Sequence, residues 1–160
     1  MTAFTDTIAS AGIFQRCALF VVALLGALGL AGCATLSPGG SAATQEKREV
    51  EIAALIEESS ENIVSARASH VRSGLGVNLY VNFDMATDAV TAAELEAVLR
   101  VVAPRVPEAI GVVRFSADNA QGDAIPLTDA AEELGLPELS IKSEGVVTFG
   151  PKSLAERYEE

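Results

Sequence analysis

The sequence lacks tryptophan entirely and has one histidine and two cysteines in 160 residues. Without Trp, and with only 5% aromatic residues, it lacks the usual stacking platform for sugars or single-stranded nucleic acid. Both cysteines, Cys17 and Cys33, lie near the N-terminus. The remainder of the chain therefore has no thiol for a disulfide, a thiolate metal site or a nucleophile, and its stability must come from a hydrophobic core.

Basic residues are scarce. Lys and Arg total 11 against 22 Asp and Glu, which gives a net charge of −11. Nucleic-acid binding needs clustered Lys and Arg, so this composition argues against it. The same charge disfavours peripheral docking of the domain on anionic lipid. Attachment to a membrane, if it occurs, has to come from a separate segment.

Such a segment is present near the N-terminus. Arg16 precedes an uncharged apolar run from Cys17 to Leu30, which small residues follow. As a helix, this run with Ala31 and Gly32 is about 24 Å long, shorter than a comfortable transmembrane span. A basic residue, a short apolar run and small residues are typical of a secretory signal peptide. The alternative is an uncleaved N-terminal membrane anchor.

Leu30-Ala31-Gly32-Cys33 resembles the lipobox of bacterial lipoproteins. The resemblance implies cleavage between Gly32 and Cys33, and a lipid, including palmitate-type acyl chains, on the Cys33 thiol. Two or three acyl chains hold a protein stably at a membrane, whereas one does so only marginally. The implied location is the extracytoplasmic face of the cell membrane. Because Ala34 follows the cysteine, the family's sorting rule implies the outer membrane in a host that has one.

Composition divides the chain into three parts. We expect a signal peptide at residues 1–32, a lipidated cysteine with a flexible tether at 33–45, and a single domain at 46–160. Ser, Pro, Gly and Ala dominate the tether, which shows no apolar periodicity. With this organisation the chain resembles small lipoproteins of actinomycetes, which implies location and fold class but no activity.

The first half of the domain predicts a helix and a β-hairpin. Residues 46–59 have apolar residues at helical spacing, with Glu49, Glu57 and Glu58 turned outward. Residues 62–71 predict a strand, Ser73-Gly74 a turn, and 75–84 a second strand of strict period two. The expected buried positions of the two strands are Val64, Ala66, Ala68, His70, Leu75, Val77, Leu79, Val81 and Phe83.

The second half predicts a helix crossover and further short elements. Thr91 and Glu94 form a capping box before an apolar stripe to Val102, and Pro104 ends that helix. A strand at 109–115 follows, and it should run parallel to the preceding strand because a helix connects them. The remaining expectations are a polar loop at 116–124, a helix at 129–134, a strand at 146–149 and a helix at 152–158.

These elements predict an α+β fold. We expect a two-layer sandwich in which a mixed sheet of about four strands carries helices on one face. The other face should be solvated, and it presents a candidate binding face made of Arg67, Asn78, Tyr80 and Asn82.

No catalytic or metal-binding constellation emerges from the sequence. His70 lies near Ser65, Ser69 and Ser73, but no nucleophile elbow surrounds these serines, so a structural histidine is favoured. A calcium loop at 117–128 fails because Ala117 and Thr128 occupy its first and last positions. Acidic clusters are interpreted as solvated helix ends; these are Glu57, Glu58 and Glu61, then Glu132 and Glu133, then Glu159 and Glu160. We predict no catalytic residue, cofactor or metal.

One further local pattern points to the cell envelope. Gly145-Val146-Val147-Thr148-Phe149-Gly150 is similar to a strand of BON domains, small α/β modules of bacterial envelopes associated with membranes or other macromolecules. The expected function is a non-catalytic envelope module that binds a protein or another envelope component, because no catalytic constellation emerges, a tether precedes the domain and the solvated strand face carries Asn78, Tyr80 and Asn82. Two alternatives stay open. A lipid or small-ligand carrier needs a cavity between helix and sheet, where Ala66, Ala68 and Ala97 leave room. An envelope hydrolase would use His70 or a carboxylate pair formed in the fold.

Overall fold

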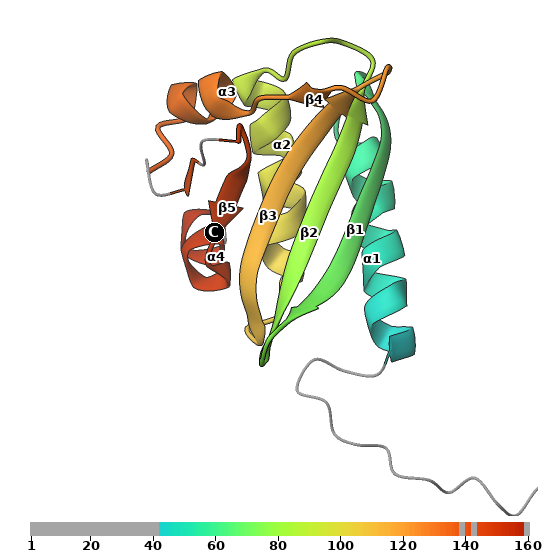
Figure 1. Cartoon of the computed structure of the whole chain (residues 1–160), viewed down its shortest axis with the longest axis vertical. Helices are drawn as coiled ribbons and strands as arrows, with labels where there is room; N and C mark the ends of the chain where they lie inside the picture. Colours follow the sequence, from blue (N-terminus) through green and yellow to red (C-terminus); the bar gives the residue numbers. More distant parts are fainter. Residues whose placement is uncertain (1–41, 138–139, 142–143, 159–160) are drawn as a thin grey trace, which may run out of the picture. The chain divides into compact units, whose positions relative to one another are not determined.

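The computed structural model describes residues 42–137, 140–141 and 144–158, and these residues form four α-helices, a short 3-10 helix and a five-stranded sheet (Figure 1). In chain order the elements are α1 (Ala42–Glu57), β1 (Ile63–Ser73), β2 (Gly76–Met85), α2 (Ala92–Val102), η1 (Ala103–Arg105), β3 (Ile110–Asn119), β4 (Ala124–Ile125), α3 (Thr128–Glu133), β5 (Val147–Phe149) and α4 (Pro151–Tyr158).

The sheet is mixed, as the sequence predicts. β1 and β2 form an antiparallel hairpin, and α2 carries the chain to β3, which runs parallel to β2. Two short strands share the outer edge of β3. β4 pairs antiparallel with Ala117 and Asp118, and β5 pairs antiparallel with Val113, Arg114 and Phe115. The α+β prediction is therefore confirmed.

A single hydrophobic core lies between one face of the sheet and the helices. Leu79, Val81 and Phe83 of β2 are at most 1% exposed, and α1, α2 and α4 all contribute to the same core. Phe115 and Phe149 meet edge to face with ring centroids 6.2 Å apart. The period-two pattern explains this layout because alternate residues of a strand point to opposite faces. In the described part of the chain, the helices cover one face and leave the other open.

Two residues of the hairpin are not where period two predicts them. Val64 is 63% exposed, because the strand register is irregular between Ile63 and Ser65. As a result Ile63, and not Val64, points into the core. Leu75 is fully exposed, because the strands end at Ser73 and Gly76 and leave Gly74-Leu75 as the hairpin turn. Gly74 adopts φ +60°, a conformation suited to such a turn.

β3 is longer than predicted. Residues 116–119, expected in a polar loop, continue the strand beside β2 up to the pair Met85 and Asn119. The turn is confined to residues 120–123, and β4 follows it. Ser116 and Asp118 lie on the open face and Ala117 lies in the core, so period two continues with these two polar residues on the solvated side.

Helix α1 begins earlier than predicted, so residues 42–45, expected in the tether, form its first turn. Its glutamates also differ from the prediction: Glu49 and Glu57 turn towards the sheet. The backbone N–H of Ala66 donates to Glu57 Oε1 at 2.9 Å, and that of His70 donates to Glu49 Oε1 at 2.6 Å. The eight helical residues from Glu49 to Glu57 and the four strand residues from Ala66 to His70 both span about 12–13 Å. The two carboxylates therefore lie level with the two N–H groups that they bind.

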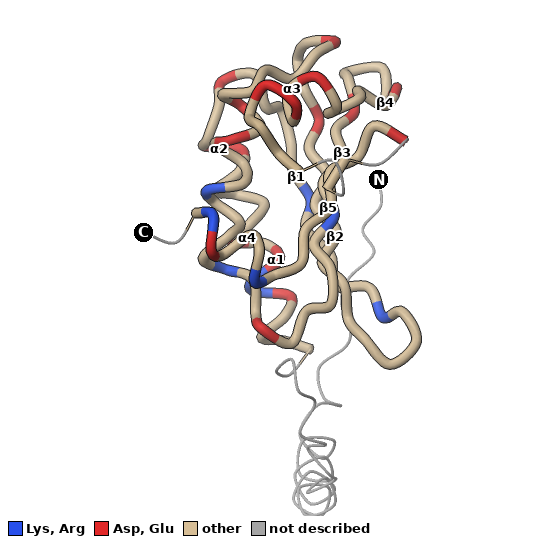
Figure 2. Tube along the Cα trace, turned by 90° about the vertical axis from the view of Figure 1, so that its left-hand side faces the viewer, with Lys and Arg blue, Asp and Glu red and all other residues tan. Residues whose placement is uncertain are grey.

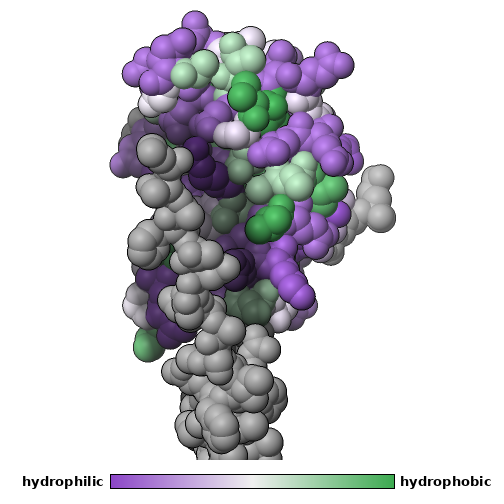
Figure 3. Space-filling view, turned by 90° about the vertical axis from the view of Figure 1, so that its right-hand side faces the viewer, coloured by the Kyte–Doolittle hydropathy of each residue, from purple (hydrophilic) through white to green (hydrophobic). Residues whose placement is uncertain are grey.

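We call Glu49 and Glu57 the edge clamp, because they bind N–H groups on the free edge of β1. An exposed strand edge otherwise presents unpaired backbone groups that can pair with another chain. Figure 3 shows this side of the molecule, where hydrophilic residues surround separate hydrophobic ones. Among the described residues, Val50 and Val64 are highly exposed hydrophobic residues of α1 and β1.

The capping box of α2 is confirmed, and it also ties down the α1–β1 turn. Thr91 N–H donates to Glu94 Oε2 at 2.9 Å, while Glu94 N–H donates to the Thr91 hydroxyl at 3.3 Å. Asn62 Nδ2 donates to Glu94 Oε1 at 2.6 Å. Burial alone would raise the pKa of the Glu94 carboxyl, but hydrogen bonds from the Thr91 backbone, Asn62, the Thr91 hydroxyl and Ser60 hold it below the usual 4.5.

The predicted signal peptide (1–32), the lipobox with Cys33 and the tether up to residue 41 lie outside the described residues. Within the described part of the chain, no helix combines the length and the apolar composition that crossing a membrane requires.

Candidate functional site

The open face of the sheet is the candidate site, because the described helices leave it uncovered. Strand pairing places Arg67 of β1 opposite Asn82 of β2, and Ser69 opposite Tyr80. The parallel pairing of β2 with β3 places Asn82 beside Ser116 and Asp84 beside Asp118. The predicted binding residues Arg67, Asn78, Tyr80 and Asn82 thus share one face, and their binding to a partner stays a prediction.

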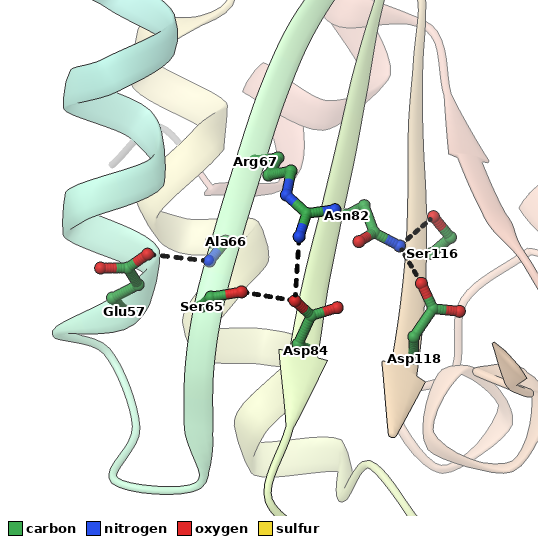
Figure 4. Close-up of polar contacts among 8 residues, drawn as sticks. All are labelled: Glu57, Ser65, Ala66, Arg67, Asn82, Asp84, Ser116 and Asp118. Atoms are coloured by element: carbon green, nitrogen blue, oxygen red, sulfur yellow. Dashed lines mark hydrogen bonds and ion pairs between the residues drawn. The ribbon is translucent and has the colours of Figure 1, made fainter. Parts of the chain in front are cut away.

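A polar cluster occupies the end of the open face where β2 and β3 finish (Figure 4). Asn82 Nδ2 donates to Ser116 Oγ at 3.1 Å and to Asp118 Oδ2 at 2.9 Å. The Ser65 hydroxyl donates to Asp84 Oδ2, and an Arg67 guanidinium nitrogen lies 3.5 Å from the same oxygen. The cluster therefore links three strands through side chains as well as through the backbone.

Arg67 and Asn82 offset the repulsion between two neighbouring carboxylates. Asp84 and Asp118 are register partners, so their negative charges lie close together across parallel strands. Asp84 contacts the cation and Asp118 binds the amide, which compensates for that repulsion. The Arg67 side chain is 76% exposed, and an ion pair this open to water adds little stability. Its guanidinium is available to a partner.

A hollow of about 480 Å³ lies beside this cluster. Its lining includes Arg67, Asp84, Asp118 and Asn119, and the turn residues 120–122 form one wall. Side chains of both signs of charge line it together with the apolar Val64 and Met85, so it suits a partner that offers hydrogen bonds as well as apolar contact.

Asn119 builds the turn that borders the hollow. Its Oδ1 accepts the N–H groups of Gln121 and Asp123 at 3.0 and 2.9 Å. Its Nδ2 donates to Asp88 Oδ1 at 3.0 Å. The turn considered above as a calcium loop is thus a β-hairpin turn closed by an asparagine side chain. The described residues contain no group of three or more His, Cys, Asp and Glu side chains placed to hold a metal ion.

Tyr80 occupies the middle of the open face and is 36% exposed. The guanidinium of Arg114 lies 6.0 Å from its ring centroid, and Arg114 also forms a 2.8 Å ion pair with Glu144. An aromatic ring backed by an arginine is a common feature of interaction surfaces, because it provides contact area with little loss of side-chain entropy.

His70 lies on the helix side of β1, where period two places it. Its side chain is 4% exposed, and its Nδ1 lies 2.8 Å from Glu49 Oε1. Its Nε2 is buried without a hydrogen-bond partner. The serines considered with it, Ser65, Ser69 and Ser73, belong to the opposite face of the strand. Their placement separates them from the imidazole, so these residues do not form a Ser-His-acid triad.

The sequence prediction misses several residues of this site. Ser116 and Asp118 fall in the predicted loop, although Val113, Phe115 and Ala117 continue the period-two pattern through this stretch. Glu49 and Glu57 fall on the predicted solvated helix face. Their spacing of eight residues, with Ala53 between them, places all three on one helical stripe, which is the signal that could have identified them.

Comparison with known proteins adds no family. No protein-family model matches the chain, and a search of curated proteins gives no match. The segment 145–150 forms β5 and its flanks, and its similarity to BON domains stays a prediction, as does the lipobox.

Proposed function

We propose that the chain is a lipid-anchored, extracytoplasmic lipoprotein whose α+β domain binds a protein or another component of the cell envelope through the open face of its sheet. The lipid on Cys33 attaches the chain to the membrane, and the domain, with no cofactor, presents the binding surface.

The uncovered sheet face is the observation that carries this proposal. The described helices cover one face, and the other face holds Arg67, Tyr80 and Asn82 together with the hollow beside the polar cluster. An extended strand face of this kind suits a macromolecular partner, which can span several strands at once. The polar cluster is already hydrogen bonded within the domain, so its side chains are pre-organised for binding.

The lipid attachment is tested by mass spectrometry of the chain isolated from its membrane, compared with Cys33→Ala. We expect the wild type to begin at Cys33 and carry the mass of a diacylglyceryl group with or without a further acyl chain. The variant should keep residues 1–32 and carry no lipid. A wild type without lipid mass contradicts the anchoring proposal.

The binding face is tested by site-specific photocrosslinking in intact cells. A photoreactive phenylalanine analogue replaces Tyr80 on the open face and, in the matched control, exposed Ala54 on the outer side of α1. We expect a discrete adduct from position 80, reduced by the additional change Arg67→Ala, and no such adduct from position 54. Equal labelling at both positions, or none at position 80, would overturn the proposed binding face.

A further inference from the structure

The tip of the β1–β2 hairpin is an unusual place for a hydrophobic residue. Leu75 is fully exposed at the turn, and Val71, two residues before the end of β1, is 43% exposed. Arg72 lies between them in sequence and is also exposed. No acidic residue occurs in the chain from 71 to 83. The tip therefore combines an apolar side chain with a cation and has no carboxylate of its own.

The chain that leads to the predicted anchor enters the domain at the same end. Glu49 is level with His70, and α1 runs antiparallel to β1. Ala42 lies seven helical residues before Glu49, about 10 Å, and Ser73 lies three strand residues beyond His70, also about 10 Å. The start of α1 is thus level with the hairpin tip. The nine residues from Cys33 to Ala42 span about 30 Å at most.

Charge is distributed unequally between the two ends of the domain. In Figure 2 the end carrying α3 and β4 is dominated by acidic residues, whereas the other half carries both signs. Among the described residues, Arg67 belongs to this acidic end, and the guanidinium of Arg157 reaches it by donating to the Leu134 carbonyl at 2.6 Å. The acidic residues there are Glu57, Glu58, Glu61, Asp84, Asp88, Glu94, Asp118, Asp123, Asp129, Glu132 and Glu133. The net charge of the whole chain disfavours docking on anionic lipid. It does not reveal that the hairpin end is less acidic than the opposite end.

We propose that the hairpin tip, Leu75 with Arg72 and Val71, contacts the lipid surface to which the chain is anchored and so orients the domain with its acidic end away from the membrane. This inference rests on the proposed anchoring. One leucine and one arginine bind a bilayer weakly. A short tether, however, gives an effective concentration on the order of millimolar, at which a weak contact is populated. Repulsion between the acidic end and anionic headgroups favours the same orientation.

The absence of tryptophan makes a direct test possible, because one introduced Trp is the sole reporter. Leu75→Trp places it at the tip, and Gln121→Trp, in the exposed β3–β4 turn, is the control at the opposite end. Each full chain, purified from membranes, is reconstituted into vesicles of phosphatidylcholine with phosphatidylglycerol, with and without brominated acyl chains. We expect brominated lipid to quench the indole at position 75 and shift its emission to shorter wavelength, and to leave the indole at position 121 unaffected.

The remaining outcomes separate the possible failures. If the chain floats with the vesicles but the reporter at position 75 is not quenched, the tip does not contact lipid and this inference is wrong, while anchoring stands. Equal quenching at positions 75 and 121 also contradicts it, because the domain then has no preferred orientation. A shift of the emission at position 75 to shorter wavelength without quenching by brominated lipid, lost at high dilution in the bilayer, identifies a second copy of the chain as the partner and overturns the lipid contact. If the chain does not float, the anchoring proposal fails and the inference fails with it.

Discussion

At the scale of single residues, Gly145 illustrates how one backbone position limits the sequence. It adopts φ +75°, and a Cβ built on it would lie 2.8 Å from the Cα of Pro126. Its carbonyl accepts the N–H of Leu127 at 2.7 Å, so the two segments are held together at this point. Gly122 shares the unusual backbone conformation, with φ +84°, but no atom lies within 4 Å of its Cβ position.

This pair gives a matched prediction. Gly122→Ala should lower the free energy of unfolding by about 1–2 kcal/mol, the cost of the left-handed conformation for an L-residue. Gly145→Ala should lower it by about 3 kcal/mol, because overpacking against Pro126 adds to that cost. Urea unfolding followed by circular dichroism measures both. Equal losses for the two variants would show that the contact with Pro126 does not matter.

Residue roles are only partly predictable. The period-two pattern places His70 on the buried side of its strand and Arg67 with Asn82 on the solvated side, and the structure agrees. The partner of His70, Glu49, is missed because its polarity favours a solvated helix face, and only its helical spacing with Ala53 and Glu57 indicates that it turns towards the strand edge. The prediction for Val64 is wrong for a related reason: a β-bulge changes which residues face the core and leaves no clear trace in the sequence.

At the scale of elements, α1 acts as a cover for the edge of the sheet. Removing Glu49 frees the backbone N–H of His70 and takes the partner from its buried Nδ1, which should cost about 1–3 kcal/mol of stability. Removing Glu57 as well frees the N–H of Ala66 on the same edge strand of eleven residues. Besides the loss of stability, freeing this edge should promote self-association.

We expect Glu49→Ala/Glu57→Ala to form oligomers or aggregates at concentrations where the wild type is monodisperse, as measured by light scattering. The control Glu46→Ala/Glu58→Ala removes the same charge from exposed positions of the α1 region and should behave as the wild type does. Aggregation of both double variants to the same extent would point to lost net charge instead of the exposed edge.

The capping box of α2 gives a prediction about pH. The pKa of Glu94 in the folded chain lies below 4.5, so the ionised carboxylate stabilises the fold above that pH, and this contribution is lost as pH falls through the folded pKa. Glu94→Gln keeps the shape of the capping box but not the charge. Its free energy of unfolding should be about 1 kcal/mol lower than that of the wild type above pH 5. The difference should shrink at lower pH, and a difference that is independent of pH contradicts the role assigned to the charge.

Among elements, strong local patterns are the most predictive. The alternation in β2, the Thr91–Glu94 pair and Gly135 after α3, which has φ +64°, each identify an element that the structure contains. The start of α1 is missed because Ala and Thr at residues 42–44 lack apolar periodicity. The end of β3 is missed because polar residues on a solvated face resemble a loop.

At the scale of the whole molecule, the described domain holds together without cysteine, since both cysteines of the chain lie before it. Its core is continuous from α1 through the sheet to α4. We therefore expect the urea midpoint of unfolding to be the same with and without reductant. A lower midpoint in reductant would mean that a cysteine crosslink between chains contributes to stability.

The fold class follows from the order of the elements, because strand, strand, helix, strand leaves few ways to bury the apolar faces. The identity of the partner that binds the open face does not follow from the order of the elements. Arg67, Asn82 and Asp118 are brought together by strand register; within the domain Asn82 donates to Asp118, and Arg67 pairs with Asp84. What such a surface binds depends on the shape of the partner, which a single chain does not encode.

The edge clamp also has a mechanical consequence. A force that reaches the domain through its N-terminal chain enters at Ala42, and it loads α1 before any strand. The bonds between Glu49 and His70, the ion pair of Glu51 with Arg105 and the bond from Ala66 to Glu57 bear that load in this order along the helix. Pulling would therefore peel α1 away one contact at a time, while the ladder between β1 and β2 stays closed. The helix would yield before the sheet and dissipate the force that the tether transmits.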